Sequence, residues 1–234
     1  MGNNPEYCGI LGLSCHMFEI ILFDLDGTIS DSKEGVTKCT QYALSHFGIE
    51  VSDLRQLERF VGPPINTSFV EFYGFNEEDN KKAVALFRER YTEKGKDEHK
   101  IYSGMAEAIR ALHDDGRVIA LATSKLQHFA EAILEEYGIR DCFNVVIGST
   151  LDGTRITKTE VISEIFRILS IDGDMLNRTV IIGDRKYDVE GAKECGISSI
   201  CVRHGCAEEG ELEEAGADYI VETPEELLSL LRKK

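Results

Sequence analysis

Short apolar runs alternate along the chain with stretches in which apolar residues recur every three or four positions. The runs lie at residues 20–23, 118–122, 144–147, 179–182 and 198–202. Runs that are largely apolar, rather than alternating, are typical of strands buried on both faces, as in a parallel sheet. These five runs therefore predict the strands of a buried parallel sheet.

The spacing between these runs is that of amphipathic helices. Met105, Ile109 and Leu112 fall on one helical face. Thr157 and Glu160 have the spacing of a capping box at the start of another helix. Strands and helices that alternate with short connections predict an α/β fold, a doubly wound Rossmann-like parallel sheet.

One interval is too long for a single crossover helix. More than ninety residues separate the runs at 20–23 and 118–122, whereas a strand–helix–strand unit needs about thirty. Helical patterns within the interval lie at residues 32–47, 53–60, 65–73 and 76–92. We therefore expect a small helical-bundle cap domain at residues 32–97, inserted into a core of residues 17–31 and 98–234. Polar residues at both joints suit a hinge.

Composition narrows the classes of partner. The chain has 42 Asp and Glu residues against 26 Lys and Arg residues, a formal net charge of −16. Such acidity, without any basic stripe, argues against binding to a nucleic-acid polymer or an anionic membrane surface. No apolar run approaches the roughly 18 residues of a membrane span. A small molecule is the expected partner, and the sequence does not determine the oligomeric state.

The number and spacing of the cysteines predict the cellular compartment of the protein. Seven cysteines without a CxxC pair are typical of a cytoplasmic protein with reduced thiols. Cys201, His204 and Cys206 fit no common zinc spacing, so we expect them to be structural. Residues 1–16 lack the basic start and long apolar stretch of a secretion signal, and we expect them to form a disordered tail.

Two carboxylates follow the first predicted strand. Asp24 and Asp26, one residue apart, could hold a cation or act as a nucleophile and an acid, and an Asp-rich turn is the alternative. A calcium-binding EF-hand loop is excluded, because Ile29 stands where its glycine is required and Gly35 where its glutamate is required.

Further polar residues lie at corresponding places along the chain. Thr123 and Ser124 follow the second strand, Asp184 and Asp188 follow the strand at 179–182, and Lys158 opens the capping-box helix. Ligands of doubly wound sheets bind beyond the carboxyl ends of the strands. We therefore expect these side chains to converge with the first pair of carboxylates.

Together these motifs resemble a known family. The sequence DLDGT at 24–28, a hydroxyl residue after a second strand, a lysine, and GDxxxD at 183–188 form the four-motif signature of the haloacid-dehalogenase-like hydrolases. The resemblance covers residues 18–231, and the helical insertion resembles that family's cap. Shorter segments resemble one branch of this family, which is labelled 5′-nucleotidase-like and is related to the phosphoglycolate phosphatases. These segments lie at residues 60–64, 71–74, 123–125, 148–149 and 183–186.

The resemblance implies a role for each catalytic residue. Asp24 would attack phosphorus and form an aspartyl-phosphate. Asp26 would protonate the leaving oxygen and then activate water. Lys158 would neutralise negative charge at the nucleophile, and Thr123 with the backbone N–H of Ser124 would bind the phosphoryl oxygens.

The resemblance also implies a metal cofactor. Mg²⁺ would be held by Asp24, the backbone carbonyl of Asp26, and Asp184, with Asp188 bound to it or supporting it. The fourth motif departs from its usual form, since Arg185 stands where a hydroxyl residue is common. Arg185 could contact the cap, an acidic neighbour or the substrate, and we expect a solvated salt bridge.

These motifs predict a Mg²⁺-dependent phosphatase for a small phosphomonoester, with 5′-nucleotides and phosphoglycolate as candidates. Dehalogenases and phosphonatases need no acid at the place of Asp26, which favours a phosphoester. Arg59, Asn66 and the turn at 62–64 could touch the leaving group, or the turn could be a rigid connection. A phosphosugar mutase on the same scaffold is the enzymatic alternative, and a non-catalytic regulatory protein is another.

Overall fold

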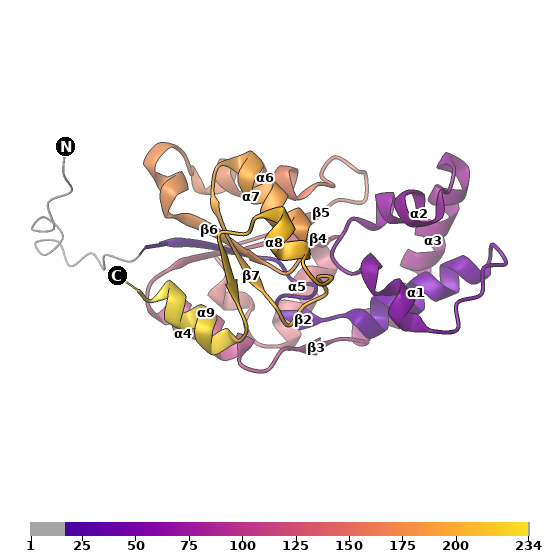
Figure 1. Ribbon diagram of the computed structural model, residues 1–234, viewed down its shortest axis with the longest axis horizontal. Helices are drawn as coiled ribbons and strands as arrows, with labels where there is room; N and C mark the ends of the chain where they lie inside the picture. Colours follow the sequence, from indigo (N-terminus) through magenta and orange to yellow (C-terminus); the bar gives the residue numbers. More distant parts are fainter. Residues whose placement is uncertain (1–16, 234) are drawn as a thin grey trace, which may run out of the picture.

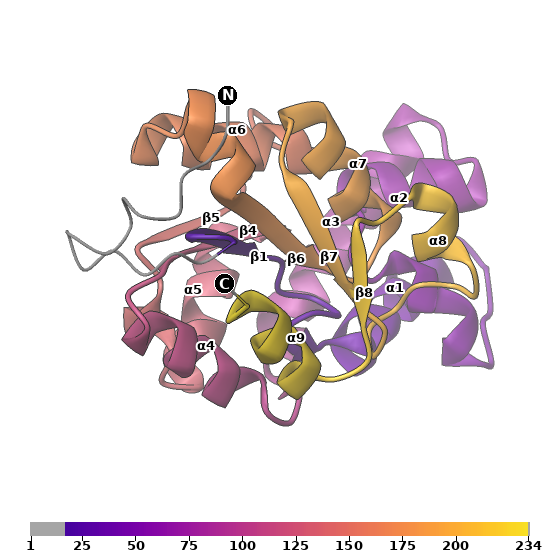
Figure 2. The ribbon, with the colours of Figure 1, turned by 60° about the vertical axis from the view of Figure 1, so that its left-hand side comes forward.

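Six parallel strands form the central sheet of this protein. The structure is a computed structural model and describes residues 17–233, so the predicted tail at 1–16 lies outside the described residues. The sheet lies on one side of the molecule, beside the inserted helices (Figure 1), and its strand order is β5-β4-β1-β6-β7-β8 (Figure 2). The strands are β1 Ile20–Phe23, β4 Val118–Leu126, β5 Val145–Ser149, β6 Thr179–Gly183, β7 Ser198–Val202 and β8 Tyr219–Val221. The predicted doubly wound α/β fold is confirmed.

Helices cover both faces of the sheet (Figure 2). On one face lie α4 Met105–Asp114, α5 Gln127–Glu136 and α9 Pro224–Leu231, and on the other α6 Lys158–Leu169 and α7 Lys186–Cys195. Along β1, Ile21 and Phe23 pack into the first layer, whereas Ile20 and Leu22 pack into the second. Burial of both faces explains the apolar runs of the sequence.

Two parts of the core differ from the sequence-based expectation. β4 continues to Leu126, and its pairing with β5 shifts register between Ala122 and Leu126, so Thr123 and Ser124 lie within its irregular end. The predicted elements did not include β8, α8 Glu211–Ala215 or α9, because each is only three to eight residues long. Within residues 17–233, no helix is both long and apolar enough to cross a membrane.

The inserted helices enclose a hydrophobic cluster of their own. They are α1 Lys33–Ser45, the 3-10 helix η2 Leu54–Phe60, α2 Ile65–Tyr73, α3 Glu77–Glu93 and the 3-10 turn η3 Gly95–Asp97. Further 3-10 turns in the core are η4 Arg140–Cys142 and η5 Gly173–Arg178. Leu44, Leu57 and Phe69 are fully buried among these helices. We call residues 32–97 the helical cap, and its boundaries as a domain stay a prediction.

The chain enters and leaves the helical cap at neighbouring points. β2 Ser30–Asp31 and β3 Lys100–Ile101 pair antiparallel at the boundary between cap and core (Figure 1). Just beyond this pair, Glu98 binds Arg90 of α3 at 2.8 Å. The two crossings therefore lie side by side, next to the carboxyl end of β1.

Candidate active site

Three carboxylates meet where the strand order of the sheet reverses. The chain leaves β1 toward β4 and β5, and it returns on the other side of β1 at β6. Asp24 follows β1, Asp184 follows β6 and Asp188 lies in the first turn of α7. All three are buried and each places an oxygen within 4.8 Å of the others. This edge is where ligands of doubly wound sheets bind.

Asp184 is held in place by the turn after β1. Thr28 Oγ1 donates to Asp184 Oδ1 at 3.2 Å, and the backbone N–H of Cys206 donates to Oδ2 at 2.7 Å. Gly27 has a φ of +85°, and a Cβ there would lie 2.1 Å from Asp184 Oδ2. Only glycine allows both this conformation and this close approach.

Lys158 reaches the carboxylates from the start of α6. The capping box predicted at Thr157 is present and fixes the first turn of this helix. Lys158 Nζ lies 2.9 Å from Asp24 Oδ1 and 2.8 Å from Asp188 Oδ1, and it donates to the carbonyl oxygen of Ala122 at 2.9 Å. Burial lowers the pKa of Lys158, but the charges of Asp188 and Asp24 outweigh burial and raise it overall.

The carboxylate cluster carries more negative charge than Lys158 can balance. Burial raises the pKa of Asp24 to about 7; Lys158 opposes this shift and Asp188 adds to it. Burial also raises the pKa of Asp184, and the charges of Asp188 and Asp24 raise it further. Closely spaced carboxylate oxygens in need of positive charge suit a hard divalent cation. The residues present therefore fit the Mg²⁺ that the resemblance implies.

The side chain of Asp26 lies apart from this cluster and is paired with Lys125. Asp26 Oδ2 lies 2.8 Å from Lys125 Nζ, and both side chains are nearly buried. Asp26 Oδ1 has no hydrogen-bond partner within the part of the chain that the structure describes. Lys125 Nζ also lies 4.7 Å from the ring centre of Tyr91 in the helical cap. The sequence analysis missed Lys125 as a site residue, although it directly follows the hydroxyl motif.

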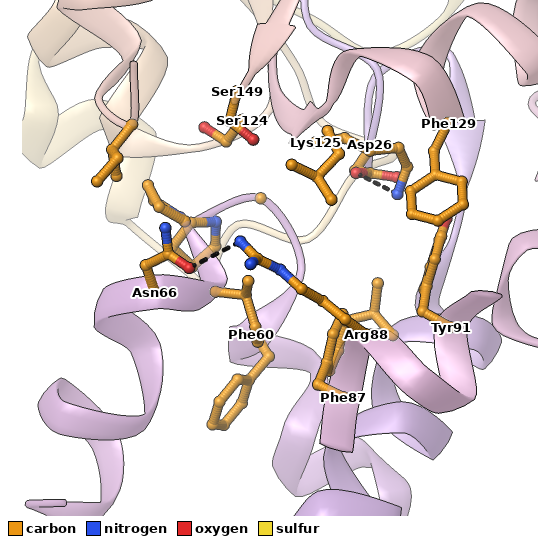
Figure 3. Close-up of a pocket in the computed structure, with 17 residues that line it drawn as sticks. Asp26, Phe60, Asn66, Phe87, Arg88, Tyr91, Ser124, Lys125, Phe129 and Ser149 are labelled. Carbon is orange, nitrogen blue, oxygen red and sulfur yellow. Dashed lines mark hydrogen bonds and ion pairs between the residues drawn. The ribbon is translucent and has the colours of Figure 1, made fainter. Parts of the chain in front are cut away.

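The predicted phosphoryl-binding residues lie at the irregular end of β4. Thr123 is buried, and its Oγ1 accepts a hydrogen bond from the backbone N–H of Lys125 at 3.2 Å. This bond uses a lone pair of Oγ1, so the Thr123 hydroxyl can still act as a donor. Ser124 lines a pocket together with Ser149 at the end of β5 (Figure 3).

This pocket, which we call the cap pocket, lies between the sheet edge and the helical cap. Residues of the core and of the cap line it on opposite sides, with Asp26, Ser124 and Lys125 from the core and Asn66, Phe87, Arg88 and Tyr91 from the cap (Figure 3). Asp26, two residues after Asp24 of the carboxylate cluster, therefore directs its side chain to the cap pocket.

The cap candidates predicted from sequence lie in two different places. Asn66 and the turn at 62–64 line the cap pocket. Arg59 lies outside it, with its guanidinium 4.7 Å from the ring centre of Phe72. Arg88, which the sequence analysis did not single out, lines the cap pocket and donates to Asn66 Oδ1 at 3.1 Å.

Arg185 is buried, so the expected solvated salt bridge is wrong. Its exposed fraction is 4%, and its Nε lies 2.8 Å from Oε1 of Glu211 in α8. A terminal guanidinium nitrogen donates to the carbonyl oxygen of Val61 in the helical cap at 2.7 Å. Arg185 thus contacts both an acidic neighbour and the cap, because α8 folds back over the fourth motif.

The reversed strand order, the buried carboxylates and the lysine define a hydrolase of the haloacid dehalogenase type. Residues 21–202 match the family of haloacid dehalogenase-like hydrolases, and the chain belongs to this family. The resemblance drawn from the four motifs is therefore confirmed.

Two similar proteins are named as enzymes that act on phosphate esters. A 5′-nucleotidase of Pseudomonas aeruginosa is 40% identical over 192 residues, which cover 82% of this chain and 86% of that protein. The crystal structure of a predicted phosphatase from Clostridium acetobutylicum has a TM-score of 0.87 and 42% identity, covering 91% of this chain and 97% of that chain. This chain is accordingly a haloacid dehalogenase-like phosphatase, a hydrolase of phosphate esters.

Another relative has a different name. The tyrosine-protein kinase PtkA of Mycobacterium tuberculosis is 32% identical over 187 residues, which cover 80% of this chain. The match spans 62% of the length of that kinase. The same fold therefore occurs in a longer protein named for transfer of phosphate to tyrosine.

Proposed function

We propose that this phosphatase hydrolyses small phosphomonoesters, with 5′-nucleotides as its main substrates, through an aspartyl-phosphate. The observation that supports this most strongly is the separation of two carboxylates. Asp24 lies with Lys158 in the buried cluster, whereas Asp26 faces the cap pocket beside Lys125. A nucleophile and a general acid need this division, because one acts on phosphorus and the other on the leaving oxygen.

The two steps use these carboxylates in turn. Asp24 attacks phosphorus and the bond to the leaving oxygen breaks, while Asp26, which must carry a proton in this step, gives it to that oxygen. Water then attacks the phosphoryl group on Asp24 while Asp26 takes up the proton of the water. Inorganic phosphate leaves and both carboxylates return to their starting state.

The remaining residues bind and neutralise the phosphoryl group. Mg²⁺, which Asp24, Asp184 and Asp188 would hold with the backbone carbonyl of Asp26, supplies positive charge to the phosphoryl oxygens when bound. Lys158 keeps the nucleophile in position. The Thr123 hydroxyl and the N–H of Ser124 are proposed to bind the phosphoryl oxygens, which is most of what phosphoryl transfer requires of a protein.

Phosphate release with and without Mg²⁺ tests the proposal. The panel comprises p-nitrophenyl phosphate, 5′-nucleotides, phosphoglycolate and a hexose 1-phosphate. We expect Mg²⁺-dependent release, and Asp24→Asn should lower kcat at least about 1000-fold because the nucleophile is lost.

Asp174→Asn is the matched control, since Asp174 is exposed on η5 and should leave kcat unchanged. The proposal is wrong if the wild type releases no phosphate from any member of the panel, or if Asp24→Asn keeps its activity. Isomerised sugar phosphate in place of free phosphate would support a mutase.

A further inference from the structure

Arg88 is a half-buried cation that has no acidic partner within residues 17–233. Its Nε is buried and has no hydrogen-bond partner among the described residues. Burial lowers the pKa of Arg88, and no carboxylate of the described residues opposes this shift. Arg90, two residues further along α3, binds Glu98 at 2.8 Å. Because unpaired buried donors lower stability, the position of Arg88 suggests that its partner is a ligand.

Asn66 holds Arg88 at the wall of the cap pocket. Asn66 Oδ1 accepts from the guanidinium at 3.1 Å, and the backbone carbonyl of Asn66 accepts from Asn80 Nδ2 at 2.7 Å. Since Oδ1 faces Arg88, the amide nitrogen of Asn66 can donate to another group. The two side chains therefore form a surface of hydrogen-bond donors on the cap side of the pocket, across from Ser124 and Lys125 (Figure 3).

Most of the other lining side chains are apolar. They come from the cap and from the core: Val36, Phe60, Pro63, Pro64, Ile65, Phe87, Leu126, Phe129 and Ile156. Apolar walls with a few convergent polar groups are typical of small-molecule sites, and aromatic side chains such as Phe87 and Phe129 can stack against a flat ring. Acceptor atoms on such a ring would satisfy the donors of Arg88 and Asn66.

We propose that Arg88 and Asn66 recognise the base of a nucleotide by donating hydrogen bonds to a base carbonyl oxygen. This inference rests on the proposed function, in which the phosphate lies at Asp24 and the leaving group enters the cap pocket. The proposal makes a specific distinction between bases. Hypoxanthine, guanine and uracil carry a carbonyl group, whereas adenine carries an amino group that would face these donors unfavourably.

Steady-state kinetics with IMP, AMP and ribose 5-phosphate test the proposal. The wild type should have a higher kcat/KM for IMP than for AMP. Arg88→Met should lower kcat/KM for IMP about 10- to 100-fold, mainly through KM, because a charged hydrogen bond to the base is lost. The values for AMP and ribose 5-phosphate should change less than about threefold, since neither offers that acceptor.

Lys81→Met is the matched control, since it removes a cation from the exposed side of the same helix. It should leave all three values unchanged. Equal losses on all substrates in Arg88→Met, or no wild-type preference for IMP over AMP, would overturn the proposal. Phosphoglycolate is measured as a fourth substrate, and a loss in Arg88→Met that is confined to it would also overturn the proposal, because Arg88 would then bind a carboxylate.

Binding of inosine separates this proposal from the proposed function. Inosine carries the base but no phosphate, so its affinity can be measured by calorimetry without any turnover. Wild type should bind inosine more tightly than adenosine, and Arg88→Met should remove the difference. Absence of phosphate release from p-nitrophenyl phosphate would contradict the proposed function alone, whereas equal binding of both nucleosides would contradict the role of Arg88 alone.

Discussion

At the scale of single residues, the buried pair of Asp26 and Lys125 should contribute to stability and, under the proposed function, to proton transfer. Lys125→Met leaves Asp26 in the same buried place without its 2.8 Å partner. Removing one member of a buried ion pair costs about 3 kcal/mol of unfolding free energy. We expect that loss in urea denaturation, together with a kcat at least about 10-fold lower because proton transfer at Asp26 is disturbed.

The double variant Asp26→Asn/Lys125→Met serves as the control. It removes both charges, so it should be more stable than Lys125→Met while remaining inactive. If both variants unfold at the same urea concentration, a buried Asp26 carboxylate without Lys125 does not destabilise the protein.

The titration of Asp24 predicts how the metal-free protein responds to pH. Its ordinary pKa of 3.8 is raised to about 7 by burial. Between these values the folded protein keeps a proton that the unfolded chain has lost, so rising pH favours unfolding. We expect the melting temperature of the metal-free protein to fall from about pH 5 to about pH 7 through this linkage.

Bound Mg²⁺ should reverse this trend. Metal binding requires ionised carboxylates, so Mg²⁺ should raise the melting temperature more at about pH 8 than at about pH 5.5. Asp184→Asn should melt higher than the wild type without metal, because it removes one repelling carboxylate, and it should lose the response to Mg²⁺. A response to Mg²⁺ that survives in Asp184→Asn would rule out Asp184 as a ligand.

At the scale of elements, Arg185 joins three parts of the fold. It precedes α7, binds Glu211 of α8 and donates to Val61 of the helical cap. Arg185→Met leaves Glu211 without its buried cation and Val61 without this donor. We expect the free energy of unfolding, measured in urea, to fall by about 3 kcal/mol.

Arg203→Met is the matched control at the element scale. Arg203 also binds a glutamate of α8, Glu213, at 2.7 Å, but its side chain is 41% exposed. Exposed pairs contribute less than about 1 kcal/mol, so this variant should remain close to the wild type. If Arg185→Met and Arg203→Met lose the same free energy of unfolding, burial does not make the Arg185–Glu211 pair more stabilising than the Arg203–Glu213 pair.

At the scale of the whole molecule, the net charge of −16 is concentrated away from the site motifs. Nine acidic residues and no Lys or Arg lie within residues 207–226, which contain none of the four motifs. Some of these acids have structural partners, as Glu211 has Arg185 and Asp218 has the backbone N–H of Ser199. Salt screens the others over about 8 Å.

The charge of the site itself predicts how inorganic phosphate binds. With three carboxylates and one lysine in the cluster, an anion meets net negative charge unless a cation is present. Phosphate should bind at least about 10-fold more weakly without Mg²⁺, measured by calorimetry. Equal affinity with and without the metal would show that Lys158 and the phosphoryl-binding groups suffice.

Much of the fold and of the candidate site could be predicted from the sequence, because the patterns that indicate them are local. The buried strands appear as apolar runs, the capping box at Thr157 is a four-residue pattern, and the four motifs each follow a strand or open a helix. Parallel strands present their carboxyl ends at one edge of the sheet. Asp24 and Asp184 each follow a strand and Lys158 opens a helix, so these places in the sequence were enough to predict that the three side chains converge.

Only the tertiary structure decided which charges are paired. In the sequence, Lys125, Arg88 and Arg185 are three ordinary cations. In the structure, Lys125 pairs with Asp26 and Arg185 is buried against Glu211 of α8. Arg88 lines the cap pocket, and its Nε has no hydrogen-bond partner among the described residues. Each outcome depends on contacts between segments that are far apart in sequence, and burial changes the energy of a charge far more than residue type does. The sequence by itself determined the fold and the residues of the carboxylate cluster, whereas long-range packing determined which charges are paired, buried or exposed to the cap pocket.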